Sequence, residues 1–265
     1  MRPYLALFSL AAATALFGQT DEGFPELIPE QRGGVMYQAT IESALQLHGY
    51  ALAKESLLRG LRDANAQVRS MAAGQLAKQG VGEAVPFILE ALSSEKAIGT
   101  RVWMANALVK MGAKAGTTEL RAICGAATAS YFPRLVAAGY LLDAGDATCR
   151  DQVIDMVRAM SNLESSFREG LLIYGLRLCR GPYAPMFQPK AAEVREVTTA
   201  LLRDKDRGVR MEASNALGEH GDATSLAVLQ EAAAAETSDI TRVRMLANIK
   251  ILQDKARLSA KDKEQ

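Results

Sequence analysis

A short sequence pattern recurs along this 265-residue chain, mostly at intervals of 32 to 34 residues. In each copy an Arg is followed after three residues by a residue that is usually Ala, after seven by Leu or Ile, and in most copies after eleven by Gly. The copies are VRSMAAGQLAKQG (68–80), TRVWMANALVKMG (100–112), PRLVAAGYLLDAG (133–145), FREGLLIYGLRLC (167–179), VRMEASNALGEHG (209–221) and VRMLANIKILQDK (243–255). The fourth copy fits loosely, and a degenerate seventh copy lies upstream at residues 38–49. A period near 33 predicts stacked copies of one supersecondary unit.

The spacing within each copy predicts a helix with a defined end. Positions 3, 7 and 11 after the Arg lie close to one face of a 3.6-residue helix, and a Gly at the end provides a left-handed C-cap. Between the copies lie second segments with apolar periodicity, at 51–62, 83–92, 117–124, 149–160, 190–203 and 223–235. Each repeat is therefore expected to be an antiparallel helix pair. The predicted fold is an all-α solenoid of about six to seven stacked helix pairs.

The repeats resemble HEAT repeats, and the VRxxAxxxLxxxG form is most similar to the short HEAT-like repeats of phycobilisome lyases. The resemblance covers roughly residues 34–255. In that family an Asp six residues before the Arg hydrogen-bonds with it, which forms a ladder along the stack. The corresponding residues here are Asp63, Glu95, Thr128, Asn162, Asp204 and Ser238. The resemblance therefore implies a structural ladder that contains Asp63, Arg69, Glu95, Arg101, Arg134, Arg168, Asp204, Arg210 and Arg244.

The two ends of the sequence differ from the repeats. Residues 1–18 hold one Arg, then an apolar run too short to span a bilayer, and small residues that fit a cleavage site, as is typical of a secretory signal peptide. We expect a flexible lead-in at 19–33, a single HEAT-like solenoid at 34–256 and a disordered tail at 257–265. The leader predicts an exported protein, periplasmic or secreted, without a stable membrane anchor after cleavage.

Aromatic residues concentrate in the middle repeats and supply the candidate contact surface, because aromatic side chains commonly anchor protein interfaces. The candidates for partner binding are Trp103, Tyr140, Tyr174, Tyr183, Met186 and Phe187. We expect Tyr140 and Tyr174 to be exposed on the second helices. The segment 180–190 contains three prolines, which favours a loop over a helix. Two interpretations of this loop stay open: a binding element, or a cover over an imperfect repeat.

Cysteine and histidine are scarce, with three and two residues respectively. Cys149 opens the first helix of a pair and Cys179 closes the second, so a disulfide between them can form at one edge of the hairpin. His48 and His220 both lie just before the terminal Gly of a copy, where a histidine interacts favourably with the helix dipole. This spacing predicts no metal site and no cofactor.

The remaining composition bears on function. The chain holds 31 Lys and Arg against 30 Asp and Glu, which gives no reason to expect nucleic acid as a partner. A paired acid and base, a phosphate loop and metal-spaced ligands are all absent from the sequence. We therefore expect an exported, non-catalytic scaffold that binds another protein or an extended peptide along its concave face. The alternative, implied by the resemblance, is lyase-like or chaperone-like handling of a tetrapyrrole on a carrier protein.

Overall fold

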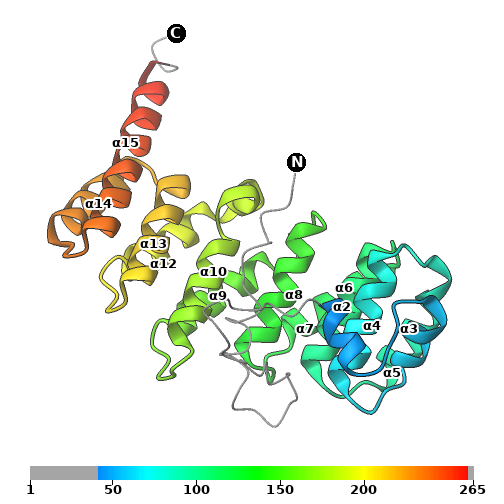
Figure 1. The fold of residues 1–265 in the computed structure, drawn as a ribbon. Coiled ribbons are helices and arrows are strands. Elements are labelled where there is room, and N and C mark those ends of the chain that lie inside the picture. The colour runs from blue at the N-terminus through cyan, green and yellow to red at the C-terminus, as the bar shows by residue number, and fades with distance from the viewer. Residues whose placement is uncertain (1–40, 262–265) are drawn as a thin grey trace. The chain divides into compact units, whose positions relative to one another are not determined.

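The computed structural model describes residues 41–261, and the regular elements in this range are all helical (Figure 1). The expected leader and lead-in, at 1–18 and 19–33, lie outside the described residues. The chain divides into two compact units, one ending at Ala129 and the other beginning at Ser130. No helix in the described range is both long enough and apolar enough to cross a membrane.

The first unit contains two complete helix pairs of the predicted repeats, α3–α4 and α5–α6, together with the single helices α2 and α7. Its elements are α2 (Ile41–Leu47), α3 (Lys54–Gly60), α4 (Ala66–Lys78), η1 (Gly82–Ala84), α5 (Val85–Ser94), α6 (Ile98–Lys110) and α7 (Lys114–Gly125). The second helices α4 and α6 pack against each other, as the stacking of adjacent repeats requires.

The second unit continues the same arrangement. Its elements are α8 (Tyr131–Asp143), α9 (Arg150–Met160), α10 (Arg168–Leu178), η2 (Gly181–Tyr183), α11 (Ala184–Phe187), η3 (Gln188–Lys190), α12 (Ala191–Leu201), α13 (Arg207–His220), α14 (Ala223–Ala235) and α15 (Asp239–Lys261). The second helices α10, α13 and α15 pack in sequence, and the first helices α9, α12 and α14 do the same. The predicted all-α solenoid is confirmed.

Residues at the conserved-spacing positions of the repeat form the core of each unit. Three and seven residues after the Arg, the side chains of four copies are fully buried; they are Ala72, Met104, Ala137 and Ala213, and Leu76, Leu108, Leu141 and Leu217. The small residues allow close approach of neighbouring helices. Each buried Leu contributes roughly 1.5–3 kcal/mol relative to an exposed one.

Helix ends follow the caps that the sequence contains. The side chains of Asn65, Asp206 and Asp222 accept hydrogen bonds from the first turns of α4, α13 and α14. Glycines end four second helices in the left-handed region, with φ between 69° and 80°; they are Gly49, Gly80, Gly112 and Gly145. Gly221 differs, because its φ is −68°. A Cβ there would lie 2.4 Å from the Leu217 carbonyl oxygen, so this position requires Gly for close packing.

The last helix is longer than expected. α15 has 23 residues and continues to Lys261, past residue 256, where the solenoid was expected to end. Its copy of the pattern has no Gly at its end, at residues 253–255, so nothing in the pattern stops the helix there.

Candidate interaction surface

The arginine ladder lies at the edge where the first helix of a repeat turns into the second. Arg69 on α4 donates through Nη1 to the carbonyl oxygens of Asp63 and Ala64, both at 2.8 Å. Its Nε donates to the carboxylate of Glu95, also at 2.8 Å. Glu95 lies in the turn of the following repeat. One guanidinium therefore links the turn of its own repeat to the next turn along the stack.

The second unit repeats this geometry at Arg210. Its Nη1 donates to the Asp204 carbonyl oxygen at 2.9 Å, and its Nε and Nη2 donate to the two carboxylate oxygens of Glu236 at 2.7 and 2.6 Å. Glu236 again belongs to the next turn.

Arg168, in the loosest copy, forms the most buried of these links. It donates to the Ser161 carbonyl oxygen at 2.8 and 3.1 Å and to both carboxylate oxygens of Asp204. The side chains of Arg168 and Asp204 are only 10% and 4% exposed.

The ladder differs from the resemblance in the identity of the paired acid. Arg69 does not pair with the Asp63 carboxylate, and Arg210 does not pair with the Asp204 carboxylate. Each Arg instead binds the main-chain carbonyl oxygen at that position. The Asp204 carboxylate instead binds the Arg of the preceding repeat, Arg168. It also accepts from the backbone N–H of Asp206 at 2.9 Å, which fixes its direction.

At the first turn of the ladder that the structure describes, the carboxylate binds a tyrosine and not an arginine. The Tyr50 hydroxyl donates to the Asp63 carboxylate at 2.6 Å. This bond, together with the backbone N–H of Asn65, lowers the pKa of Asp63. Tyr50 therefore takes the place that an arginine holds in later repeats.

In the last repeat, one residue of the predicted ladder is wrong. Arg242, and not Arg244, donates to the Glu236 carbonyl oxygen, at 3.1 Å, six residues before it. Arg244 is exposed. With Arg242 as the first position, Met245 and Ile249 fall on the core positions, at 0% and 7% exposure. The last copy of the pattern therefore begins at Arg242, two residues before the predicted position.

Arg101 completes the ladder of the first unit. It donates to the Glu95 carbonyl oxygen at 3.0 Å and to the Glu119 carboxylate at 2.8 Å. Glu119 lies on α7 and supplies the acid that Thr128 cannot provide in the turn. Arg134 is half-buried near the start of α8.

Two of the ladder carboxylates that pair with an arginine have lowered pKa values. Hydrogen bonds from Arg210 hold the pKa of Glu236 at about 2. Burial opposes ionisation of Asp204, yet Arg168 and the Asp206 backbone keep the pKa of Asp204 below its ordinary value. Both acids are therefore charged at neutral pH, and removing either partner would leave a buried charge.

A cleft opens beside the Arg69 rung, and an equivalent cleft opens beside the Arg210 rung. Their volumes are about 460 and 430 Å³. They are lined by equivalent residues, among them Arg62, Arg69, Glu90 and Glu95 in one and Arg203, Arg210, Glu231 and Glu236 in the other. Each of these arginines forms an ion pair with a carboxylate of its own cleft. The ion pairs of both clefts thus join adjacent repeats along the stack.

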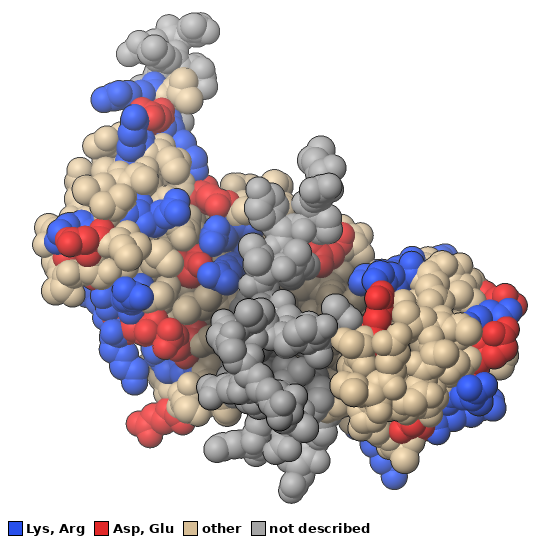
Figure 2. Space-filling model, in the orientation of Figure 1, with Lys and Arg blue, Asp and Glu red and all other residues tan. Residues whose placement is uncertain are grey.

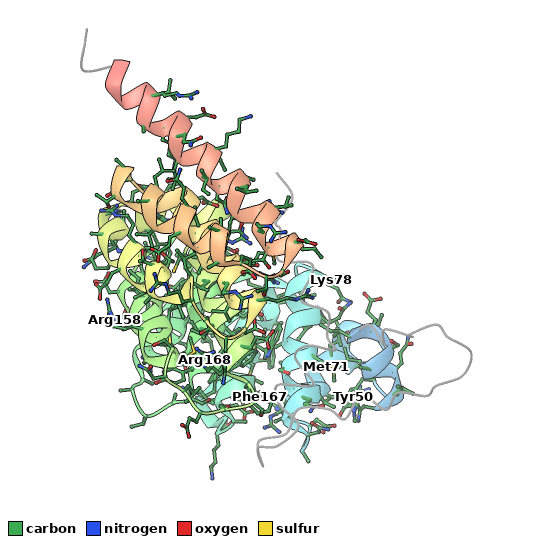
Figure 3. All side chains as sticks on the ribbon, turned by 90° about the vertical axis from the view of Figure 1, so that its left-hand side faces the viewer. Tyr50, Met71, Lys78, Arg158, Phe167 and Arg168 are labelled. Carbon is green, nitrogen blue, oxygen red and sulfur yellow. The ribbon has the colours of Figure 1, made fainter. Side chains whose placement is uncertain are left out.

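Two apolar side chains lie at the same repeat position on adjacent second helices of the first unit. Met71 on α4 is half-buried, and Trp103 on α6 is 37% exposed. Lys78 and Lys110 are exposed at the equivalent position seven residues further on in the same two helices, and Figure 3 shows Met71 and Lys78 on α4. Lys78 also pairs with Glu42 at 2.6 Å. We call Met71, Lys78, Trp103 and Lys110 the Trp103 surface.

The tyrosine candidates are less exposed than predicted. Tyr140 and Tyr174 are half-buried. Tyr174 fills the space beside Gly139, where a Cβ would lie 2.8 Å from the tyrosine hydroxyl oxygen, and burial raises the pKa of Tyr174. The Tyr183 hydroxyl donates to the Asp143 carboxylate at 2.5 Å. Tyr174 and Tyr183 therefore contribute to packing between α8, α10 and η2.

The proline-containing segment is helical, which corrects the expectation of a loop. It forms η2, α11 and η3, and a proline lies in the first turn of each, where a missing N–H costs nothing. Phe187 is fully buried, and the Met186 carbonyl oxygen accepts from Arg150 at 3.1 Å. These contacts favour a core cover over a binding element.

The predicted disulfide between Cys149 and Cys179 is wrong. Cys179 is a free, buried thiol whose Sγ donates to the Gly175 carbonyl oxygen of its own helix at 3.4 Å. Burial raises the pKa of Cys179 to about 12. Cys124 and Cys149 are both disulfide-bonded.

His220 contributes through a neighbouring helix and not through the dipole of its own. Its Nε2 lies 2.6 Å from the Cys179 carbonyl oxygen at the end of α10, to which it donates. Burial lowers the pKa of His220, so the ring is neutral at pH 7. His48 is exposed.

Sequence reasoning missed two buried carboxylates, Glu236 of the ladder and Glu212 on α13. Glu212 on α13 is 2% exposed and accepts from Arg177 and Arg180, both through Nε at 2.8 Å. Burial alone would raise the pKa of Glu212, but these two arginines lower it. Only the presence of a Glu at a repeat position that is apolar in other copies, such as Met71 and Trp103, signals this network.

The charges of the chain are distributed rather than gathered. In Figure 2, Lys and Arg of the second unit alternate with Asp and Glu over the visible face. Within the described part of the chain, no group of three or more His, Cys, Asp or Glu side chains has an arrangement that could hold a metal ion.

Comparison with known proteins agrees with this architecture. A search of curated proteins found no significant match. The family model for HEAT repeats matches residues 55–158 and 185–250, which together cover more than half of the chain. Proteins of this family are generally non-catalytic and mediate protein–protein interaction. The ladder, the stacked helix pairs and this match together show that the chain belongs to the HEAT-repeat family.

Proposed function

We propose that this chain is an exported, non-catalytic scaffold that binds an extended peptide segment of another protein at the Trp103 surface. The observation that carries the proposal is the exposed Trp103, at 37%, at the same repeat position as Met71 on the packed neighbouring helix. Large aromatic side chains in such positions are frequent anchors of interfaces.

The surroundings of Trp103 indicate the kind of peptide. The apolar pair Met71 and Trp103 crosses two packed helices, so an apolar side chain of the partner can lie against both. Lys78 and Lys110 lie about two turns further along the same helices. A segment with one apolar residue followed by acidic residues matches this arrangement of an apolar centre and a basic rim.

The single tryptophan of the chain makes the proposal testable. Peptides selected on the immobilised protein from a random phage-displayed library would be titrated while Trp103 fluorescence is recorded. We expect enrichment of apolar-acidic sequences and a shift of the emission on binding. Met71→Ala should weaken binding about tenfold.

The matched control is Met211→Ala on α13, at the position one after the ladder arginine in the second unit, where Met211 is also half-buried. Peptides that leave Trp103 emission unchanged, or that bind the Met71→Ala and Met211→Ala variants equally, contradict the proposed surface.

The leader at residues 1–18 supports export, as do the disulfide-bonded Cys124 and Cys149, since disulfides persist in oxidising compartments. N-terminal sequencing of the protein from a secreting bacterial host tests this proposal. Cleavage near residue 18 supports it, whereas an intact Met1 on protein retained in the cytosol contradicts it.

A further inference from the structure

The outer side of α15 carries large apolar side chains that no other helix of the second unit covers. Ile240, Val243, Leu246, Ile251 and Leu258 are 45–69% exposed. Figures 1 and 3 show α15 at the edge of the second unit, with its C-terminal end clear of the other helices. A terminal repeat normally needs a polar outer face for solubility, so this exposed apolar face requires an explanation.

Six exposed residues on this side follow a heptad spacing. Ile240, Arg244, Ala247, Ile251, Asp254 and Leu258 are separated alternately by four and three residues. This spacing places them on one stripe of the helix and is the pattern of a coiled-coil seam. Core residues such as Met245 and Ile249 lie on the opposite side, against the body of the unit.

The charges within the stripe determine which arrangement of two helices it fits. In a parallel pair, Arg244 would face Arg244 of the partner and Asp254 would face Asp254, so both layers would be repulsive. In an antiparallel pair centred near Ile249, Arg244 of each copy faces Asp254 of the other copy. The apolar positions agree with this register.

In the same antiparallel register, Ile240 lies opposite Leu258, and Ala247 lies opposite Ile251. The small Ala247 leaves room for the larger Ile251 in the central layers. All six positions are therefore complementary to a second copy of the same stripe, which is the property of an interface with two-fold symmetry.

We propose that α15 pairs antiparallel with α15 of a second copy of this chain, and that two Arg244–Asp254 ion pairs between the copies set the direction. Within one copy, Asp254 also approaches Arg257, at 3.7 Å. The seam covers a single helix on each side, so the dimer forms reversibly and its population depends on concentration.

Sedimentation equilibrium of the full mature chain, from about 1 µM to about 1 mM, measures this association. We expect a monomer–dimer equilibrium for the native sequence. Arg244→Asp and Asp254→Arg each place like charges opposite one another twice, so each should weaken the homodimer about tenfold or more.

Two further samples make the test specific. The double variant Arg244→Asp/Asp254→Arg restores both ion pairs and should dimerise within about threefold of the native chain. An equimolar mixture of the two single variants should form a heterodimer, since each pair then joins opposite charges. Lys114→Asp is the control with the same charge change, placed at the exposed first residue of α7, where an acidic residue is well tolerated.

Circular dichroism of each variant checks that the helix content of the chain is unchanged. A native chain that stays monomeric throughout the concentration range overturns the proposal. So does a double variant that fails to recover dimerisation, or a Lys114→Asp variant that weakens it as much as Arg244→Asp. None of these results depends on peptide binding at Trp103.

Discussion

Glu236→Gln removes one negative charge from the Arg210 rung while keeping the size of the side chain. The Glu236 side chain is 1% exposed, and Arg210 holds its pKa at about 2 instead of 4.5. That lowering corresponds to about 3 kcal/mol in favour of the folded state at neutral pH. Because the rung opens to a cleft where solvent screens the pair, we expect a loss of about 2–3 kcal/mol. The amide can still accept from the Ser238 backbone, so the change isolates the charge.

The assay is urea unfolding followed by circular dichroism between pH 2 and pH 7. A carboxylate with a lowered pKa stabilises the fold above its unfolded value near 4.5, and this contribution disappears as the pH falls to about 2. The difference in the free energy of unfolding between the native chain and Glu236→Gln should therefore be largest at pH 7. It should shrink towards zero as the pH approaches 2.

The control for this experiment is Glu231→Gln. Glu231 pairs with Arg203 at 2.7 Å, but the two side chains are 67% and 74% exposed. We expect a loss below about 0.5 kcal/mol. Equal losses for the two variants, or a Glu236→Gln difference that is independent of pH, would refute the reasoning.

Three further outcomes follow from the structure. Arg168→Ala should cost about 3–5 kcal/mol in thermal or urea unfolding, because it leaves Asp204 charged and buried; a loss under about 1 kcal/mol would contradict the buried rung. Gly112→Ala should destabilise the fold by about 1–2 kcal/mol, since φ there is +75°. Gly74→Ala inside α4, where a methyl group meets nothing within 4 Å, should instead stabilise the helix by about 0.5–1 kcal/mol. Stability changes of the same sign for the two variants would contradict this geometry. Cys179, with a pKa of about 12, should resist a thiol reagent at pH 8 until the chain unfolds, and rapid modification of the folded protein would show that the thiol is accessible.

The helices and their core positions could be predicted because the repeat carries their periodicity directly. The four-residue spacing of Ala72 and Leu76 places them on one helix face, and both are buried. The last copy fits the pattern in two registers, because Arg242 and Arg244 both precede apolar residues at the required offsets. Only the core positions of α15, Met245 and Ile249, separate the two registers.

The partner of each ladder arginine could not be predicted from spacing along the chain. The side chain of Arg69 lies as close to the turn of the next repeat as to its own, and the superposition of turns in the stack decides which carboxylate it reaches. Sequence distance to Glu95, 26 residues on, carries no such information.

Exposure in the middle repeats was overestimated for a related reason. Three prolines in 180–190 favour a loop, yet each lies in the first turn of a short helix, and these helices bury Phe187. Tyr174 looked exposed by its position on the second helix, but Gly139 on the neighbouring helix α8 leaves a space that the tyrosine fills. Such pairwise complementarity between repeats is visible only after stacking.

The most direct test of the ladder between repeats is a pair of double-mutant cycles on Arg69. One cycle combines Arg69→Ala with Glu95→Ala and the other combines it with Asp63→Ala, each measured by urea unfolding. Because the Glu95 carboxylate binds the guanidinium while Asp63 offers only its main-chain carbonyl, we predict a coupling of about 1–3 kcal/mol with Glu95 and below about 0.5 kcal/mol with Asp63. A larger coupling with Asp63 than with Glu95 would place the ion pair within one repeat and contradict the account.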